Sequence, residues 1–312
     1  MSLFRVHWLG TSSGLPTLER NVSCLLVEVG GRLVVLDAGE GAQILLKRGR
    51  FHLGGLHAVC VTHAHGDHSF GLPGLFSTLW LLHQHQPQLV ADAAVAEFLR
   101  QALHLSTGER DQIDVTLLDE EKVLRQVLEW NGGRQGEVKL FAQQLDHRIT
   151  AHGFRLELKY HVPARVNSDE VLARGLKQGS AWGKLVAGEN VRAPDGSWII
   201  AAQVCSPARM EHRSFAYLTD TRYCEASVEL AAGADLISHE TTFLPRDQAR
   251  ADQLGHSTTD DALRVLTESG ARQLVMTHFS PRYKREEYQA AVESHPLAER
   301  VIFAEDGLCI DL

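Results

Sequence analysis

The chain has 312 residues, 44% of them hydrophobic, so it can bury a large core, and its formal net charge is −8. That balance argues against a protein that coats nucleic acid non-specifically, although a local basic patch still suffices for a nucleic-acid enzyme. The sequence has no run of 18 or more apolar residues and no secretory-signal pattern at its start, so we expect no membrane span and no export.

The first half of the chain predicts short strands that alternate with helices. Gly30 and Gly31 separate two apolar runs, which is typical of a tight hairpin. Gly49 follows a helical pattern and is expected to end that helix. Strands are predicted at 5–9, 24–29, 32–36, 58–62 and 88–90, and helices at 40–48, 74–82, 93–103 and 121–130.

The second half repeats the rhythm of strand followed by helix. The clearest helix is predicted to begin after Thr258, which can act as N-cap with Asp261 three residues later, and to end before Gly270. Strands are predicted at 215–218, 235–237 and 273–276. The alternation in both halves predicts the α/β class, with a layered sandwich that occupies residues 1–312 as a single domain.

Residues 160–200 interrupt this rhythm. The segment is rich in glycine and polar residues, and its hydrophobic residues show little periodicity, so we expect an inserted arm with little regular structure. From Lys159 to Lys184 it carries five basic side chains against two acidic ones, which makes it a basic stretch on an acidic chain. Such an insertion is either functional or an ordinary polar loop.

A dense group of possible metal ligands directly follows a predicted strand. His63 and His65 are two residues apart, so in an extended chain both side chains point the same way. Gly66 allows a sharp turn that brings Asp67 and His68 towards a second position. Zinc binds imidazole and carboxylate groups, and a catalytic zinc site leaves one position for water. The pattern favours a metal site over a surface loop that happens to be rich in His and Asp.

Four ligands are too few for two metal ions, and the chain offers more at comparable places. Asp220 and His278 each follow an apolar strand, and His147 follows a β-like stretch. In open α/β sheets, sites form at the carboxyl ends of the strands. Each of the three is more often structural when taken alone, but together with the first group they indicate one metal centre.

The number and spacing of the cysteines indicate the cellular compartment in which the protein is expected. They are five in number, lie far apart and include no Cys-x-x-Cys pair: Cys24, Cys60, Cys205, Cys224 and Cys309. This arrangement disfavours both a disulfide scaffold and a thiolate zinc site, and a reducing cytoplasm fits it best.

The run from His63 to His68 resembles the HxHxDH signature of the metallo-β-lactamase superfamily. Further motifs follow in an order that resembles ribonuclease Z, the family of tRNA 3′-processing endonucleases. These motifs are Leu9–Gly14 with Pro16, Arg20, Asn21 and Ser23, then Asp37–Gln43, Phe70–Leu75, Thr219–Arg222, His239–Phe243, His256–Thr258 and Thr277–Tyr283.

The resemblance implies a four-layer αβ/βα sandwich with an inserted arm and two zinc ions per chain. The implied ligands are His63, His65 and His147 for one ion, Asp67, His68 and His278 for the other, and Asp220 between them. Two metal ions about 3.5–4 Å apart can clamp the attacking and leaving oxygens of a phosphodiester.

The resemblance also implies catalytic roles. Asp67 would act as base on the attacking water, and His256 would give a proton to the departing ribose oxygen, with Glu240 as its partner. The alternative for Glu240 is a buried structural carboxylate. The implied reaction removes the 3′ trailer from precursor tRNA and leaves a 3′-hydroxyl on the tRNA.

The arm is implied to grip tRNA, mostly through phosphates, in a homodimer where one subunit's arm serves the other's site. The implied substrate-binding residues are Lys177, Gly179, Gly183 and Lys184 in the arm and Arg20 in an early loop. That loop has Leu18 where the family pattern has lysine, which predicts weaker selection against tRNAs that already carry CCA.

Two rival hypotheses stay open on the sequence. One is a two-zinc phosphodiesterase or 3′-exonuclease that acts on other RNA or on small phosphodiesters. The other, from a different class, is a catalytically silent protein that binds metal or RNA. Precursor tRNA cleavage separates the first rival from the leading hypothesis, and metal analysis tests the second.

Overall fold

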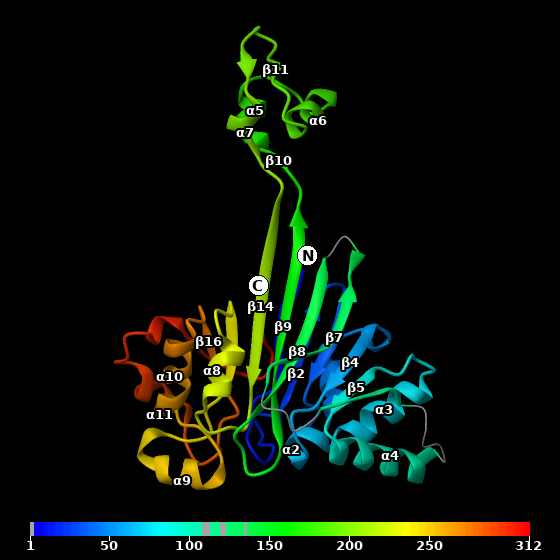
Figure 1. Ribbon diagram of the computed structural model, residues 1–312, viewed down its shortest axis with the longest axis vertical. Coiled ribbons are helices and arrows are strands. Elements are labelled where there is room, and N and C mark those ends of the chain that lie inside the picture. The colour runs from blue at the N-terminus through cyan, green and yellow to red at the C-terminus, as the bar shows by residue number, and fades with distance from the viewer. Residues whose placement is uncertain (1–2, 108–112, 119–122, 134–135) are drawn as a thin grey trace. The chain divides into compact units, whose positions relative to one another are not determined.

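The computed structural model describes residues 3–107, 113–118, 123–133 and 136–312 (Figure 1). The contacts within it divide the chain into two compact units. The first contains the described residues up to Gly133 together with Glu137–Leu158 and Arg213–Leu312. The second contains Lys159–His212 and Gly136. The predicted arm at 160–200 therefore lies within a unit of its own.

One sheet of the first unit has the strand order β18-β1-β2-β3-β4-β5-β6. Its strands are β1 Phe4–Gly10, β2 Cys24–Val29, β3 Arg32–Leu36, β4 Leu56–Cys60, β5 Gln88–Ala91, β6 Val115–Leu117 and β18 Leu308–Asp311. The predicted hairpin is confirmed, because Gly30 and Gly31 join β2 to β3 with φ values of 56° and 76° that suit glycine. From β3 to β6 the strands run parallel.

The other sheet has the order β17-β16-β15-β14-β9-β8-β7. Its strands are β7 Arg125–Asn131, β8 Glu137–Leu145, β9 Ala151–Val162, β14 Arg209–Leu218, β15 Leu236–Glu240, β16 Leu274–Thr277 and β17 Val301–Phe303. From β14 to β17 the strands run parallel. Strands β9 and β14 lead into and out of the second unit.

The helix predicted at 121–130 is wrong. Residues 121 and 122 lie outside the described residues, and the chain from Arg125 to Asn131 forms β7, which pairs antiparallel with β8. Trp130 lies opposite Val138 and is the buried residue of this edge strand. Short apolar runs fit helix and strand periods about equally well, and here the backbone partner on β8 decides between them.

Helices cover the outer faces of both sheets, with α3 and α4 on one side and α8 and α10 on the other (Figure 1). This confirms the predicted layered α/β sandwich. The helices of this unit are α1 Ala42–Arg48, α2 Gly66–Ser69, α3 Leu72–Leu81, α4 Ala93–Thr107, α8 Glu225–Ala231, α9 Gln248–Leu254, α10 Thr259–Ser269 and α11 Arg285–Val292. Short 3-10 turns lie at Leu53–Gly55, Pro245–Asp247 and Ala298–Arg300. Within the described ranges, no helix has the length and apolar character needed to cross a bilayer.

Side chains from the inner faces of the two sheets meet in a shared core. Trp8 of β1 packs edge-on against Phe215 of β14 at 6.2 Å between ring centroids, and both are fully buried. The indole nitrogen of Trp8 donates a hydrogen bond of 2.9 Å to the Ser238 hydroxyl on β15, so its one polar atom is satisfied. This packing fixes the two sheets to one another and so fixes the loops at their ends.

Helix α10 begins and ends as predicted. The Asp261 carboxylate accepts a 2.9 Å hydrogen bond from the Thr258 backbone N–H, and the Thr258 hydroxyl accepts one from the Asp261 backbone N–H in return. Gly270 ends the helix with φ at 66°. The start of α10 matters for function because the residues before Thr258 carry a candidate catalytic histidine.

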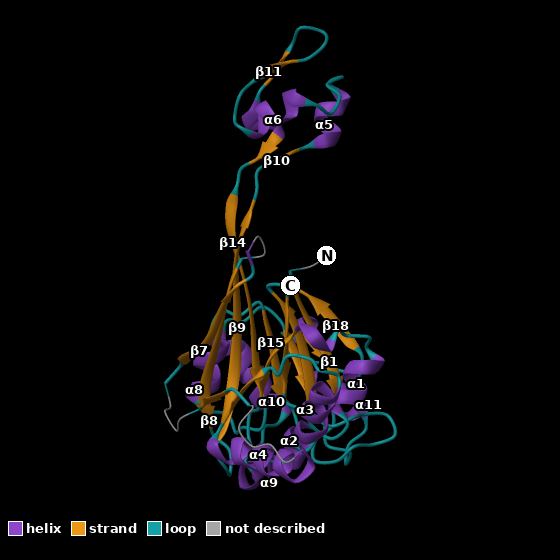
Figure 2. Cartoon of the chain, turned by 90° about the vertical axis from the view of Figure 1, so that its right-hand side faces the viewer, coloured by secondary structure: helices purple, strands orange, loops and turns teal. Residues whose placement is uncertain are grey.

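The second unit has regular structure, so the expectation of little regular structure in the arm is wrong. Figure 2 shows short helices and strands joined by long loops. They are β10 Arg165–Val166, α5 Ser168–Ala173, α6 Ser180–Val186, β11 Val191–Arg192, β12 Trp198–Ile199, α7 Ala201–Val204 and β13 Cys205–Ser206. A small core that includes Val171, Leu185 and Ile199 holds them together. Elements of two to seven residues are too short to produce a readable hydrophobic period.

Candidate metal centre

The seven predicted ligands come together at the carboxyl ends of strands from both sheets of the first unit. They fall into groups whose ligand atoms all lie within 4.8 Å of one another. The first group is His63, His65, His147 and Asp220, and the second is Asp67, His68 and His278. His63 and its neighbours follow β4 into α2, whereas the other ligands follow β8, β14 and β16.

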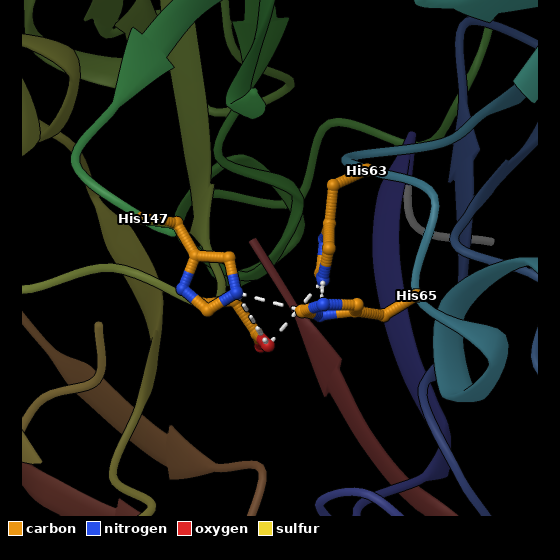
Figure 3. Close-up of side chains that lie close together, drawn as sticks. His63, His65 and His147 are labelled. Atoms are coloured by element: carbon orange, nitrogen blue, oxygen red, sulfur yellow. Dashed lines mark hydrogen bonds and ion pairs between the residues drawn. The ribbon is translucent and has the colours of Figure 1, made fainter. Parts of the chain in front are cut away.

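The three imidazoles of the first group point towards one another (Figure 3). His63 Nε2 lies 2.9 Å from His65 Nδ1, and His147 Nε2 lies 3.4 Å from the same atom. One oxygen of Asp220, Oδ2, lies 3.4 Å from His63 Nε2 and 3.9 Å from His147 Nε2. Four ligand atoms therefore surround one point.

The second group faces the other oxygen of the same carboxylate. Asp220 Oδ1 lies 3.3 Å from His68 Nε2 and 3.2 Å from His278 Nε2. Asp67 Oδ2 lies 3.4 Å from both of those nitrogens. Asp220 is thus placed between the two groups with one oxygen towards each.

These distances fit a bound divalent metal ion. A tetrahedral ion about 2.0–2.2 Å from its ligands separates neighbouring ligand atoms by roughly 3.4 Å. The separations of 2.9 to 3.9 Å lie close to that value. Imidazole and carboxylate groups gathered without a cation would leave buried polar atoms facing one another, which is costly.

The remaining ring nitrogen of four of these histidines is already occupied, which leaves Nε2 free for a metal. Such outer contacts orient metal ligands and fix their tautomers. The partners of Nδ1 are the Thr62 hydroxyl for His63 at 2.9 Å, the Asp37 carboxylate for His68 at 2.8 Å, the Gly255 carbonyl for His147 at 2.6 Å and the Thr242 hydroxyl for His278 at 2.9 Å.

Asp37 contacts one of these histidines, and it lies in a sequence motif to which no role at the site is assigned from the sequence. It is fully buried, has φ at 60°, and accepts bonds from the Thr62 backbone N–H and from the Tyr217 hydroxyl as well as contacting His68. Tyr217 lies on β14, so Asp37 links the ligand loop to the opposite sheet. Its place directly after β3 matches that of the ligands and was the available signal.

Burial and mutual charge set the protonation of the ligands. Burial, reinforced by the charge of His63, lowers the pKa of His65 to about 4, and burial lowers the pKa of His147 to about 4. Both imidazoles are therefore neutral at pH 7, which is the form that binds metal. Burial alone raises the pKa of the Asp220 carboxyl, but His278 and His68 outweigh it and hold that pKa well below its usual range.

His256 and Glu240 form a pair beside the two groups. His256 Nδ1 lies 3.0 Å from Glu240 Oε1, and Glu240 is fully buried at the end of β15. The same carboxylate accepts bonds from the Thr221 backbone N–H and the Thr242 hydroxyl. Burial lowers the pKa of His256. The negative charges of Glu240 and Asp220 raise it by more, so that the pKa is about 9. His256 also lies near Asp220 and His278 as a third group of possible ligands.

An open cavity of about 570 Å³ gives access to the centre. Asp67 lines it, and the Gly14 backbone N–H donates a 2.7 Å bond to the Asp67 carboxylate. His65, His256 and His278 also face this cavity. A substrate that enters it therefore meets ligands of both groups and the His256–Glu240 pair.

Arg20 lines a neighbouring cavity of about 720 Å³ instead. Its guanidinium donates to the Thr11 hydroxyl and to the Ala304 carbonyl and lies 4.8 Å from the centre of the Phe279 ring. These contacts hold the early loop in place. Arg20 thus does not line the cavity beside the metal ligands.

The other predicted substrate-binding residues belong to the second unit. Gly179 precedes α6, and Gly183 and Lys184 lie on that helix, while Lys177 lies in the preceding loop. A Cβ atom added at Gly179 or Gly183 would meet no atom within 4 Å. Packing inside the unit therefore does not require glycine at either position.

Comparisons with known proteins agree with this geometry. The metallo-beta-lactamase superfamily matches residues 17–135, and a beta-lactamase superfamily domain matches residues 192–279. The short form of human tRNase Z has a similar fold, with a TM-score of 0.67 at 23% identity over 98% of each chain. The metallo-beta-lactamase fold protein YhfI of Bacillus subtilis has a TM-score of 0.65 at 17% identity.

Two sequence relatives decide the family. Ribonuclease Z of Salinibacter ruber is 37% identical over 278 residues, which covers 88% of this chain and 84% of that protein. Ribonuclease Z of Myxococcus xanthus is 36% identical over 306 residues, which covers 94% of this chain and 95% of that protein. With a metal-binding geometry at the ends of its strands and relatives of this similarity over nearly its whole length, the chain belongs to the ribonuclease Z family.

Proposed function

We propose that the chain is a zinc-dependent endoribonuclease that removes the 3′ trailer from tRNA precursors and leaves a 3′-hydroxyl on the tRNA. The observation that carries this proposal is the Asp220 carboxylate, which turns one oxygen to each of two ligand groups beside an open cavity. The names of the relatives support the RNA substrate.

We propose that the two groups hold two zinc ions, since five imidazoles and two carboxylates suit zinc better than magnesium or calcium. When bound, two zinc ions neutralise charge on the phosphodiester and lower the pKa of water to about 7. Asp220 sets the spacing of the two sites, and the contacts at Nδ1 keep the imidazoles in the geometry that binds metal.

Asp67 accepts the proton of the attacking water in this proposal. Its carboxylate faces the cavity and is held by the Gly14 backbone N–H, so its position does not depend on substrate. Its Oδ2 also lies 3.4 Å from the Nε2 atoms of His68 and His278, which supports a role as a ligand of the second group. Asp67 thus combines ligation with proton transfer.

His256 supplies the proton for the departing ribose oxygen. Glu240 holds Nδ1 of this imidazole, so Nε2 is the nitrogen left for the substrate. Because Glu240 is itself fixed by Thr221 and Thr242, the imidazole is oriented before the substrate arrives. Glu240 is therefore a positioning residue, and its burial fits that role as well as a structural one.

The second unit binds tRNA in this proposal. Lys177 and Lys184 form no ion pair with any residue that the structure describes, so both are available to phosphates. Glycines that the unit's own packing does not need, Gly179 and Gly183, would allow an RNA backbone to approach closely.

We further propose a homodimer in the reducing cytoplasm. All five cysteines are free thiols, which suits that compartment. Apolar side chains are exposed on α3 and α4, among them Trp80, Leu81 and Leu105, and could be covered by a second subunit. Light scattering of the purified protein tests the dimer, and a single-chain mass at micromolar concentration would contradict it.

Processing of precursor tRNAs, with and without an encoded CCA, tests the activity. We expect one cut that releases the whole trailer and leaves a 3′-hydroxyl, which end-group analysis can identify. Stepwise loss of nucleotides would instead support a 3′-exonuclease, and turnover of bis(p-nitrophenyl) phosphate alone would support a generic phosphodiesterase. Metal analysis of the same sample should find about two zinc ions per chain.

A further inference from the structure

The cavity beside the metal centre is lined by apolar as well as charged residues. Leu15 and Phe70 are among the apolar ones, and they are 55% and 64% exposed. Arg148 is the arginine that lines the same cavity. Apolar side chains left in water at a site for a charged phosphodiester are unfavourable unless a ligand covers them.

Phe70 is supported from behind by the protein. It ends α2, and its ring lies so close to Gly66 that a Cβ built there would be 2.4 to 2.7 Å from three ring atoms. The ring centroid of Phe98 lies 6.1 Å away at an angle of 43°. These contacts hold the ring in place, while most of its surface stays open at the cavity.

Arg148 is a cation without a carboxylate partner among the described residues. The nearby Asp146 is already paired with Arg222 at 3.0 Å, so its charge is used. Arg148 directly follows the ligand His147, and a Cβ built at Gly255, at the end of α9, would lie 2.8 Å from His147 Nδ1 and 3.0 Å from the Arg148 backbone nitrogen. The residue is therefore held next to the metal centre with its charge free for an anion.

We propose that the cavity binds one unpaired nucleotide next to the scissile bond, with its base stacked on the Phe70 ring and its phosphate at Arg148. The inference rests on the proposed function. A volume of about 570 Å³ is in the range of small-ligand sites. Aromatic rings stack on any base, and guanidinium groups bind phosphate in a bidentate geometry. Recognition of this kind is tolerant of sequence, as an enzyme that removes varied trailers requires.

Abasic nucleotides test the stacking. Single-turnover cleavage is measured for precursor tRNAs that lack the base on either side of the scissile bond. In the wild-type protein, loss of the stacked base should slow cleavage about tenfold, the size of one base–aromatic contact. In Phe70→Leu, which keeps apolar bulk without the ring, the same base loss should change the rate by less than about twofold. Phe70→Tyr should restore the tenfold difference.

Controls separate stacking from damage to the centre. Ile44→Ala on α1 removes a side chain that is 50% exposed but does not line the cavity, and it should keep the wild-type sensitivity to base loss. Phe70→Leu should hold as much metal as the wild-type protein. The proposal is overturned if base loss has the same effect in Phe70→Leu as in the wild-type protein at both positions.

The phosphate contact has its own test. Replacing the phosphate next to the scissile one by a methylphosphonate should raise KM about tenfold in the wild-type protein. In Arg148→Met, KM should be the same for the methylphosphonate substrate as for the unmodified one. Arg250→Met is the matched control, since Arg250 is exposed on the neighbouring α9 and does not line the cavity. A full methylphosphonate effect in Arg148→Met would contradict the assignment.

A failure of the proposed function can be told apart from a failure of this inference. If the wild-type protein cleaves bis(p-nitrophenyl) phosphate but no precursor tRNA, the proposed function fails. The stacking is then tested by inhibition of that reaction with a dinucleotide and its abasic form. A preference for the dinucleotide that depends on Phe70 supports the nucleotide site, and equal inhibition overturns it.

Discussion

The metal centre and the second unit are built in opposite ways. At the centre, ligands such as His63 and His68 are fully buried, and the Nδ1 atom of each ring has a protein partner. In the second unit, short elements surround a small core, and Lys177, Gly179 and Lys184 face solvent. The centre is organised before any substrate arrives, whereas the function of the second unit's surface depends on the molecule that it binds. Substitutions should therefore act on chemistry in one region and on substrate choice in the other.

Loss of the shared carboxylate should have the largest effect. Asp220→Ala removes a ligand atom from both groups, so we expect activity to fall by about 10³-fold or more on every substrate. Mass spectrometry of the metal content should find less than half of the wild-type amount. Full metal content with lost activity would show that Asp220 acts in chemistry alone and that other residues hold the ions.

The proton donor should come next. His256→Ala is expected to lower kcat by about 10² to 10⁴-fold, the usual share of general acid catalysis. Since the charges of Glu240 and Asp220 overcome burial and raise the pKa of His256 to about 9, the acid form is present below that pH and is lost as pH rises through it. Glu240→Gln should move the alkaline limb of the kcat profile to lower pH. An unchanged limb would remove Glu240 from this role.

Asp37→Asn should have a smaller effect, because Asp37 acts through His68. We expect metal affinity to fall about 10- to 100-fold in a chelator competition, with tRNA and small phosphodiesters affected alike once metal is saturating. Asp235→Asn is a suitable control, since that carboxylate bonds Ser214 and contacts no ligand. If Asp37→Asn leaves the metal affinity unaltered, the buried aspartate serves the contact with Tyr217 and does not support metal binding.

Charge reversal in the second unit should have the smallest and most selective effect. Lys177→Glu or Lys184→Glu should reduce tRNA cleavage by about tenfold at low salt and affect bis(p-nitrophenyl) phosphate far less. Lys47→Glu provides the matched control, since Lys47 is an exposed residue on α1 of the first unit. Equal losses of activity on both substrates would contradict the proposal that the second unit acts on substrate choice and the metal centre on chemistry.

The same contrast explains how much could be predicted from the sequence. The ligand set was readable because four residues within six positions follow β4 and the rest follow other strands, and strand ends meet at one edge. The bonds of Asp37 were not readable, since Tyr217 is 180 positions away and only the packing of two sheets brings them together. The metal and its count stay a prediction.

Errors arose where local signals were weak. In the strand at Arg125–Asn131, a short apolar run fitted a helical period, and only the partner strand β8 settles the matter. In the second unit, two-residue strands such as Val191–Arg192 leave no periodic trace, and the shared core of that unit defines them. Helix α10, which is amphipathic and has caps at both ends, was predicted to within one residue, whereas α4 continues four residues beyond its predicted end.

The position of Asp220 has a consequence for how the enzyme acquires its metal. A cation that binds one carboxylate oxygen restricts rotation of the side chain, and the second oxygen is then already turned towards the other group. If the two groups hold two ions, as proposed, we expect their loading to be coupled, and by linkage each ion then favours the other equally. At limiting metal the protein should be mainly a mixture of empty and fully loaded molecules, with few half-loaded ones. Activity should then rise with metal supply as a threshold, so metal availability can switch the enzyme on.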